Sequence, residues 1–296
     1  MGAAHDGSSH PALRGGASAE VVVLRSLSLV VFLMMVLSTG CYPGPWSGSA
    51  FLPGSRARGQ ASPPTPVWQA GLAAVRAAAP LPSDVLDLTP WKLTLPTAGP
   101  TGYAAEVTQP ALDGYSRAPY FSVTPDGAGV AFRAPVDGAT TPGAKYARSE
   151  LREMTPAGGK AAWSSSVGAH TMEIREAITH LPSAKPEVVA GQIHDANGYI
   201  VMVRLNGSRL FVQHNGHNIG DLDTDYHLGD MFTVRLVAGA DHVRVYYNGA
   251  PKAAVEVRKR DLYFKAGCYT QSSPAVGDQP GEYGEIVIYD LRVSHQ

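Results

Sequence analysis

From residue 86 to the C-terminus, apolar and polar residues alternate with the two-residue period of β-strands. This alternation, or a run of β-branched residues, recurs in short segments bounded by Gly, Pro, Asn or Asp. No long amphipathic helix is predicted after Pro82. The segments that we predict to be strands are 91–95, 129–133, 146–154, 170–178, 188–194, 199–205, 210–214, 232–237, 242–247, 253–257, 262–271 and 284–293.

Asn-Gly dipeptides predict tight hairpins within this series. Asn206-Gly207 and Asn248-Gly249 each separate two predicted strands, and both residue types tolerate the positive φ of two-residue hairpin turns. Asn215-Gly216 carries the same signal in less regular surroundings. Many short antiparallel strands in one domain bury their apolar faces by packing as two sheets. We therefore predict an all-β fold, a two-sheet antiparallel β-jelly-roll sandwich.

The first 41 residues predict an export signal rather than part of the fold. Arg14 and Arg25 precede an apolar run at 27–37, and small residues follow it up to Cys41. This order is typical of secretory signals. The alternative is an uncleaved membrane anchor, although a spanning helix needs about 20 apolar residues. The segment 37–41 also resembles a bacterial lipoprotein processing site with its large apolar residue one place early, which leaves lipidation of Cys41 open.

Residues 42–83 have the composition of a linker, rich in Pro, Gly, Ser and Ala, with one stretch at 67–79 that could form a helix. The predicted jelly-roll domain covers residues 84–296. We expect the protein to be a monomer that is secreted or held at the cell surface, with a lipid at Cys41 as its only contact with a membrane.

Composition limits both the kinds of ligand and the kinds of cross-link that the protein can have. The formal net charge is −1 at pH 7, which argues against the broad basic surface of a nucleic-acid-binding protein but not against a local positive groove. The 32 Gly and 23 Pro residues agree with many turns. Cys41 and Cys268, the two cysteines, cannot build a disulfide framework.

The predicted strand at 263–271 has two chemically different faces, because successive side chains point to opposite sides. One face is apolar and suits a core: Phe264, Ala266 and Cys268. The other carries phenols, a cation and an amide, with Gly267 as a gap: Tyr263, Lys265, Tyr269 and Gln271. Such a face suits a groove that holds an anionic, hydroxyl-rich ligand and can move a proton.

Two other predicted strands share this design. Arg148, Glu150 and Arg152 project from one face of 146–154, and Gln192 and His194 share a face with Ile193 behind them. If the three strands line one concave sheet, cations and amides outnumber the single carboxylate. The ligand is then expected to be an anion.

Each segment taken alone has a plainer explanation. Alternating charges at 148–152 are common on surface strands with cross-strand ion pairs. A single histidine such as His194 is more often structural than catalytic, and Tyr269 alone would be a packed aromatic with a satisfied hydroxyl. Cys268 faces the apolar side, and we interpret it as a small core residue rather than a nucleophile.

Together, the three segments resemble the three sequence blocks of the polysaccharide lyase family 7 alginate lyases, in that family's order. The blocks are Arg-Ser-Glu-Leu-Arg-Glu at 148–153, Gln-Ile-His at 192–194 and Tyr-Phe-Lys-Ala-Gly-Cys-Tyr-Thr-Gln at 263–271. Residues 86–96 are similar to the opening of that domain and 284–291 to its last strand. Cys268 and Thr270 stand at positions where the family varies.

The resemblance implies a β-jelly-roll enzyme that cuts alginate, a polymer of mannuronate and guluronate, by β-elimination without cofactor or metal. It implies that Arg148 and Gln192 neutralise the uronate carboxylate and that His194 and Tyr269 are the catalytic base and acid. For mannuronate, Tyr269 could serve both steps if the neighbouring Lys265 and arginines lower its pKa. Glu150, Arg152, Lys265 and Gln271 are then substrate-binding and orienting residues. Ile193 in place of Val resembles members that favour guluronate.

Three alternatives remain at this point. A sandwich-fold glycoside hydrolase needs two carboxylates across the scissile bond, and Glu150 has no evident partner in the three blocks. A non-catalytic carbohydrate-binding module would explain the groove without both His194 and Tyr269. A lyase that acts on another polyuronate would use the same residues.

Overall fold

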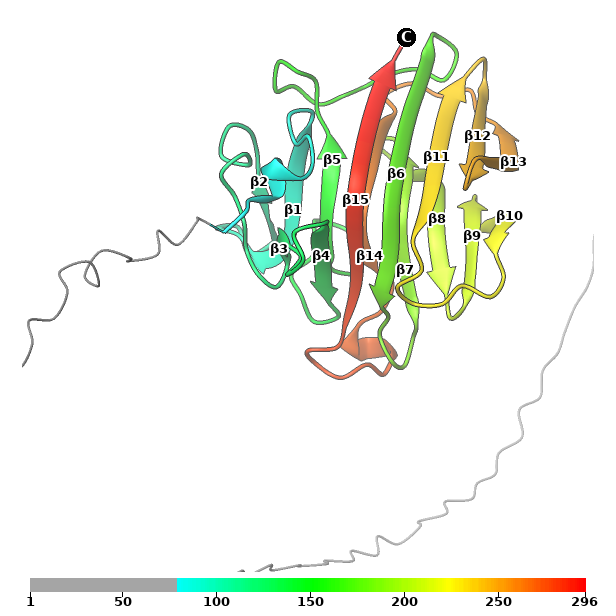
Figure 1. The fold of residues 1–296 in the computed structure, drawn as a ribbon. Helices are drawn as coiled ribbons and strands as arrows, with labels where there is room; N and C mark the ends of the chain where they lie inside the picture. Colours follow the sequence, from blue (N-terminus) through cyan, green and yellow to red (C-terminus); the bar gives the residue numbers. More distant parts are fainter. Residues whose placement is uncertain (1–78) are drawn as a thin grey trace, which may run out of the picture. The chain divides into compact units, whose positions relative to one another are not determined.

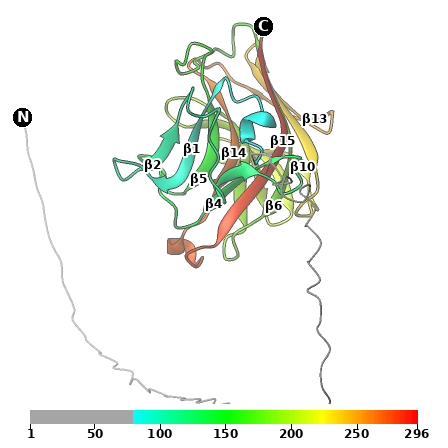
Figure 2. The same ribbon diagram turned by 60° about the vertical axis from the view of Figure 1, so that its left-hand side comes forward.

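The structure is a computed structural model that describes residues 79–296. In this part of the chain, two antiparallel sheets pack face to face (Figures 1 and 2). Apart from two short 3₁₀ helices, η2 (Pro82–Asp84) and η3 (Pro274–Val276), every described element is a strand. The all-β prediction is confirmed. The predicted export signal at 1–41, Cys41 itself, most of the linker at 42–83 and nearly all of the helix at 67–79 lie outside the described residues.

The first sheet has eight strands and carries the three segments singled out in the sequence. In spatial order its strands are β10 (His217–Asp223), β9 (Arg209–His214), β8 (Tyr199–Asn206), β7 (Glu187–His194), β14 (Tyr263–Thr270), β5 (Arg148–Glu153), β1 (Trp91–Ala98) and β2 (Ala104–Val107).

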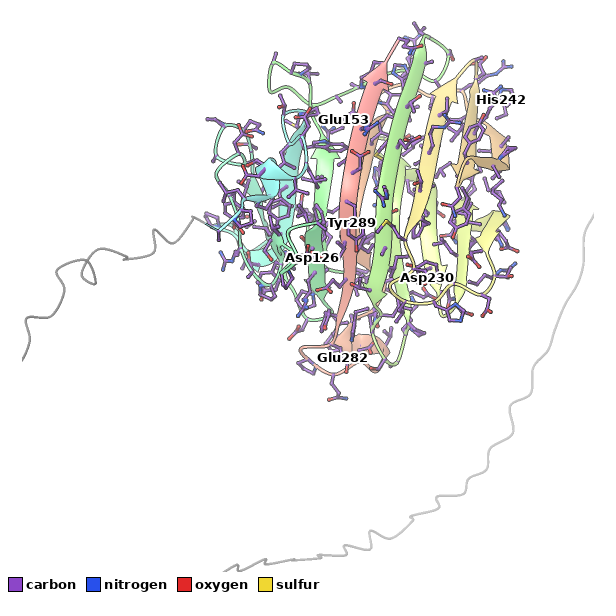
Figure 3. All side chains as sticks on the ribbon, in the orientation of Figure 1. Asp126, Glu153, Asp230, His242, Glu282 and Tyr289 are labelled. Carbon is purple, nitrogen blue, oxygen red and sulfur yellow. The ribbon has the colours of Figure 1, made fainter. Side chains whose placement is uncertain are left out.

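The second sheet has seven strands, and Figure 1 looks onto it. Its order is β13 (Ala250–Glu256), β12 (His242–Tyr247), β11 (Phe232–Gly239), β6 (Ala169–His180), β15 (Tyr283–His295), β4 (Val130–Pro135) and β3 (Phe121–Val123). Asp230, just before β11, and His242, at the start of β12, lie at opposite ends of this antiparallel pair (Figure 3).

The core lies between the two sheets and follows the predicted alternation. Buried side chains come from both sheets, among them Leu93, Leu151 and Phe264 from the first sheet and Phe132 and Ile174 from the second. Each such side chain contributes about 1.5–3 kcal/mol on burial, which fixes which face of each strand turns inward. Cys268 is a free, fully buried thiol in this core, as predicted, and burial raises the pKa of that thiol.

Hairpins form at the three Asn-Gly signals and the predicted strand segments are found, but Asn206 is the last residue of β8 and only Gly207 of that pair has a positive φ. Asn248 and Gly249 both have positive φ in the turn between β12 and β13, and Asn215 and Gly216 do the same between β9 and β10. Three strands, β2, β3 and β10, were not predicted, because their segments show little alternation of apolar and polar residues. No helix among the described residues has the length and hydropathy to cross a membrane.

Candidate active site

The three segments lie side by side as β7, β14 and β5 at the centre of the eight-stranded sheet. The register places Lys265 between Arg152 on one side and Gln192 on the other. It also sets Tyr269 opposite Arg148, and Tyr263 opposite His194. Segments far apart in the sequence therefore present their polar side chains on one face.

Gly267 allows β14 and β5 to approach closely at this point. Its φ is +130°, and a Cβ atom there would lie 2.6 Å from the Ser149 carbonyl oxygen and 2.9 Å from the Glu150 Cα. Only glycine adopts such a φ without strain. Gly267, which lacks a side chain on the polar face of the predicted strand, is thus the point where the backbones of β14 and β5 meet. The pairing of β14 with β7 also shifts register between Ala266 and Tyr269.

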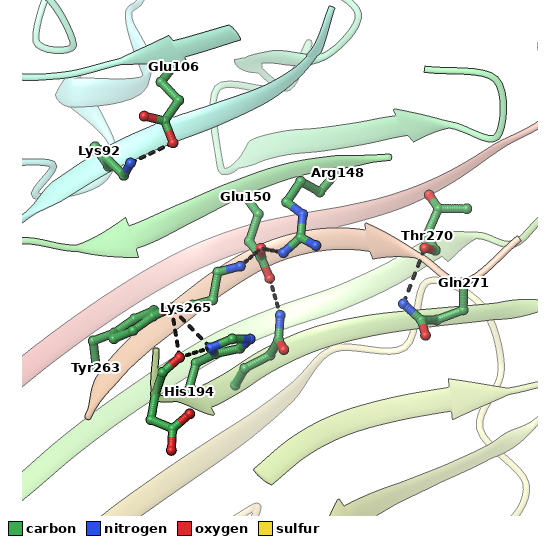
Figure 4. Close-up of polar contacts among 11 residues, drawn as sticks. Lys92, Glu106, Arg148, Glu150, His194, Tyr263, Lys265, Thr270 and Gln271 are labelled. Atoms are coloured by element: carbon green, nitrogen blue, oxygen red, sulfur yellow. Dashed lines mark hydrogen bonds and ion pairs between the residues drawn. The ribbon is translucent and has the colours of Figure 1, made fainter. Parts of the chain in front are cut away.

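A groove of about 740 Å³ lies over these strands. Six of the eight predicted site residues line it: Arg148, Arg152, Gln192, His194, Lys265 and Tyr269. Glu150 and Gln271 do not. Glu150 is 1% exposed beneath the groove, and Gln271 is buried beyond the end of β14, where its Nε2 donates to the Thr270 carbonyl at 3.2 Å (Figure 4). Neither side chain lines the groove, and the contacts observed are with neighbouring protein groups, so that substrate binding by Glu150 and Gln271 stays a prediction.

Glu150 instead organises the groove from below. Its carboxylate accepts a hydrogen bond from Arg148 Nη1 at 2.9 Å, forms an ion pair with Lys265 Nζ at 2.5 Å, and accepts from the Gln192 amide (Figure 4). Burial alone would raise the pKa of Glu150, but the charges of Lys265 and Arg148 lower that pKa to about 2. The buried carboxylate therefore stays ionised and holds three groove residues in place.

The same pairing defines the role of Lys265. Burial lowers the pKa of Lys265 to about 8, assisted by Arg148 and Arg152, whereas the Glu150 carboxylate opposes that shift. Because its ammonium group already pairs with Glu150, Lys265 contributes mainly to the internal charge balance of the site.

Two arginines stack on two tyrosines across the β5–β14 pair. The Arg148 guanidinium lies 3.8 Å from the centre of the Tyr269 ring, and that of Arg152 lies 3.9 Å from the centre of the Tyr263 ring. Stacking fixes the planes of both partners. Arg148 donates one N–H to Glu150, and its other N–H groups can donate to a ligand.

Tyr269 keeps its proton in this environment. Burial of the phenol raises its pKa above the ordinary value, as does the Glu150 charge, and together they outweigh the opposing effects of Arg148 and Gln271. Arg148 lowers the pKa of Tyr269, as expected of a neighbouring cation, but the net shift is upward. Lys265 is paired with Glu150, and the positive charge of Arg148 does not compensate for the hydration that the buried phenol loses. A phenol that stays protonated suits a proton donor.

His194 has the complementary state. Burial and then the Lys265 charge lower the pKa of its imidazole, so the ring is neutral near pH 7. Its Nδ1 lies 2.6 Å from the Asp195 carbonyl oxygen, which can only accept, so Nδ1 carries the hydrogen. The lone pair of His194 then resides on Nε2, and the ring is a base at that atom.

A half-buried neutral imidazole and a protonated phenol thus share one cation-lined groove. The family model described as alginate lyase matches residues 86–295. The chain belongs to the alginate lyase family. It is similar to the alginate lyase AlgAT5 from polysaccharide lyase family 7, at 51% identity over 74% of this chain and 100% of that one, with a TM-score of 0.72.

Two further alginate lyase structures agree. The alginate lyase from Corynebacterium sp. is 41% identical over 74% of this chain and 99% of its own, with a TM-score of 0.71. The family 7 alginate lyase A1-II′ in complex with product (GGG) is 29% identical over 74% of this chain and 100% of its own, with a TM-score of 0.63. The predicted polysaccharide lyase family 7 membership and the β-jelly-roll sandwich are confirmed.

Several groove residues of this alginate lyase family member escaped the sequence reasoning. Lys92 and Thr94 of β1, Glu106 of β2 and Lys160 line the groove, and Lys92 pairs with Glu106 at 2.5 Å (Figure 4). Lys92 and Thr94 alternate with buried Leu93, and this alternation could have predicted that both face away from the core. The sequence did not show that β1 lies next to β5. The lining contains five cationic side chains and two carboxylates: Lys92, Arg148, Arg152, Lys160 and Lys265 against Glu106 and Asp261.

Tyr263 was placed on the correct face but given no role. Its hydroxyl lies 3.0 Å from His194 Nδ1 and 3.3 Å from the Asp195 carbonyl oxygen. Among residues 79–296, no group of three or more His, Cys, Asp or Glu side chains is arranged to hold a metal ion.

Proposed function

We propose that this protein cleaves alginate by β-elimination and prefers guluronate-containing stretches. The observation that carries the proposal is the pair of opposite protonation states in one groove, neutral at His194 and protonated at Tyr269. An excess of cations along the lining supports a polyanionic substrate. Membership of the alginate lyase family supports alginate as that polyanion.

The first requirement of the reaction is to neutralise the uronate carboxylate. Removing the C5 proton places a second negative charge on this acid as an enolate-like species forms, and donors fixed in advance stabilise that charge. Arg148 and Gln192 are suited to this, because Glu150 orients both and each keeps free N–H groups. Fixed donors need no rearrangement as the charge develops.

The second requirement is to move two protons. His194 Nε2 takes the C5 proton, the C5–H electrons form the C4–C5 double bond, and the C4–O4 bond breaks. Tyr269 gives its phenolic proton to the departing O4, which leaves a tyrosinate and an imidazolium until the site exchanges protons with water. The Arg148 guanidinium stacked on the Tyr269 ring stabilises that transient tyrosinate.

The preference for guluronate follows from the state of Tyr269. Cleavage of mannuronate by Tyr269 alone would need a phenol that ionises easily, whereas this environment raises the pKa of Tyr269. Guluronate disposes its proton and leaving oxygen differently and suits separate base and acid groups. The product GGG bound to a related lyase is in keeping with this choice. Ile193, whose identity resembles that in guluronate-favouring members, is fully buried and acts at most through packing.

Parallel digestion of polyguluronate, polymannuronate and mixed alginate tests the preference. The unsaturated uronate absorbs in the ultraviolet, and its initial rate of appearance is compared at equal uronate concentration, with product sizes measured at the end. We expect polyguluronate and mixed alginate to exceed polymannuronate. A faster reaction on polymannuronate would reject the assignment of His194 as the principal base.

We also propose that the protein is exported, on the support of the charged and apolar pattern at 14–37 and the small residues up to Cys41. We propose in addition that it acts as a monomer. Mass spectrometry of the mature N-terminus after expression in a bacterial host tests export, and Cys41→Ala tests lipidation. An unprocessed N-terminus in the cytoplasmic fraction would reject export. Light scattering of the purified domain tests the monomer.

A further inference from the structure

We propose that Tyr263 is a positioning residue that holds His194 in the tautomer with a free Nε2, ready to accept the C5 proton. The inference rests on the proposed function, because it assigns a partner to the base of that reaction. Tyr263 would act through His194 rather than on the substrate.

The register brings the two side chains together. Tyr263 opens β14 and pairs with His194, the last residue of β7. Their ring centres are 5.4 Å apart, and the Tyr263 hydroxyl lies 3.0 Å from His194 Nδ1 (Figure 4). The same hydroxyl lies 3.3 Å from the Asp195 carbonyl oxygen, which itself is 2.6 Å from Nδ1. Three polar atoms thus form one small hydrogen-bonded triangle.

Counting hydrogens in this triangle leaves one consistent arrangement. The Asp195 carbonyl oxygen accepts from both partners, so the single phenolic hydrogen of Tyr263 points to it. The Tyr263 oxygen then offers a lone pair to the hydrogen on Nδ1. In the opposite tautomer, the Nδ1 lone pair would face the carbonyl lone pairs at 2.6 Å with no hydrogen between them. Two acceptors therefore favour the hydrogen on Nδ1.

Tyr263 is itself held rigidly enough to do this. The guanidinium of Arg152 lies 3.9 Å from the centre of its ring. Arg152 in turn donates to the Glu153 carbonyl at 2.6 Å and to the Ala161 carbonyl at 3.4 Å. Burial raises the pKa of Tyr263, so the hydroxyl keeps the hydrogen that the arrangement requires. When His194 becomes imidazolium, both oxygens face its Nδ1–H and stabilise the new charge.

The variant Tyr263→Phe removes the hydroxyl and keeps the ring under Arg152. We expect kcat on polyguluronate to fall by several-fold to about tenfold, the worth of one hydrogen bond, with a smaller change in KM. Imidazolium loses one acceptor, so the pKa of His194 should fall further, and the acid limb of the kcat/KM profile should move to lower pH. A merely structural role would lower kcat without moving this limb.

Tyr283→Phe is a matched control. Tyr283 also lies under an arginine, with the Arg133 guanidinium 4.0 Å from its ring centre, and it stacks on His180 at 4.0 Å, but it lies outside the groove. We expect its kinetics and pH profile to equal those of the parent.

Imidazole ¹⁵N NMR reads the tautomer without relying on activity. The parent should show His194 protonated at Nδ1 and unprotonated at Nε2, and Tyr263→Phe, in which only the Asp195 carbonyl still accepts from Nδ1, should show a larger share of the opposite tautomer. An unchanged acid limb together with an unchanged tautomer in Tyr263→Phe would overturn the inference. Failure of the parent to form unsaturated uronate would instead reject the proposed function, so the two failures are distinguishable.

Discussion

At the scale of single residues, burial shifts the pKa values of His194 and Tyr269 in opposite directions. Loss of hydration disfavours the charged form of each group, which is the cation of histidine and the anion of tyrosine. The pKa of His194 therefore falls while that of Tyr269 rises. One low-dielectric groove thus yields a neutral base and a protonated acid at the same pH.

Glu150 shows what residue types alone could not reveal. The sequence placed it correctly on the face shared with Arg148 and Arg152. Burial of its carboxylate depends on the ion pair with Lys265, which lies more than a hundred residues later in the chain. The register of β5 and β14 brings these two residues together. The role of Glu150 as an internal counter-ion, and the neutralisation of Lys265, could therefore only be found in the structure.

We predict that Glu150→Gln lowers the free energy of unfolding at pH 7 by about 3 kcal/mol, because it leaves two buried cations without their counter-ion. The pKa of Glu150 is about 2 in the folded protein and 4.5 for an ordinary glutamate, so its ionic contribution is complete above pH 4.5. That contribution is lost as pH falls through about 2. Denaturant unfolding at several pH values should show the gap between variant and parent shrinking over this window. A gap that stays constant would contradict the ion-pair account.

At the scale of elements, twelve of the fifteen described strands were predictable, and three of the four edge strands, β2, β3 and β10, were not. β14 and β15 are 8 and 13 residues long and carry apolar side chains at every second position over part of their length, and the buried face fixes their orientation. β3 has three residues and β2 has four, too few to establish a period. The order of strands also lay beyond the sequence, because β14 pairs with two strands that are distant along the chain.

The contact between β14 and β5 gives a second prediction. Gly267→Ala should lower the free energy of unfolding by about 2 kcal/mol and reduce kcat/KM, because the new Cβ meets the Ser149 oxygen at a φ that alanine avoids. The resulting strand shift would displace Arg148 from Tyr269. Gly114→Ala, where a Cβ would meet nothing within 4 Å, is the control and should leave both quantities unchanged. Equal stability of the two variants would show that the close approach is not required.

At the scale of the whole described domain, one buried group links stability to pH away from the groove. Both carboxyl oxygens of Glu176, in β6, are buried without a hydrogen-bond partner among the described residues. Burial raises the pKa of Glu176 to about 8, so the folded domain keeps this acid neutral at pH 7. The alternation in the predicted strand 170–178 already places Glu176 on the buried face of Met172, Ile174 and Ile178, and its lack of a hydrogen-bond partner among residues 79–296 became evident only in the structure.

We predict that Glu176→Gln stabilises the domain more at pH 8 than at pH 5. Between the ordinary value of 4.5 and about 8, the unfolded carboxylate has lost its proton while the folded one has not. The parent therefore loses stability as pH rises through this range, and the variant does not. Denaturant unfolding at both pH values measures the difference. Parallel pH dependence of parent and variant would show that Glu176 ionises freely in the folded state.

The most direct test of the central claim follows ultraviolet absorbance and reducing ends together while the parent and Tyr269→Phe digest alginate. We predict that both signals rise in step for the parent. Tyr269→Phe, folded and still retained on an alginate affinity gel, should lose activity by at least about a hundredfold, because only the proton donor is removed. Reducing ends without absorbance would indicate hydrolysis instead of elimination. Undiminished turnover by Tyr269→Phe would contradict the assignment of the catalytic acid.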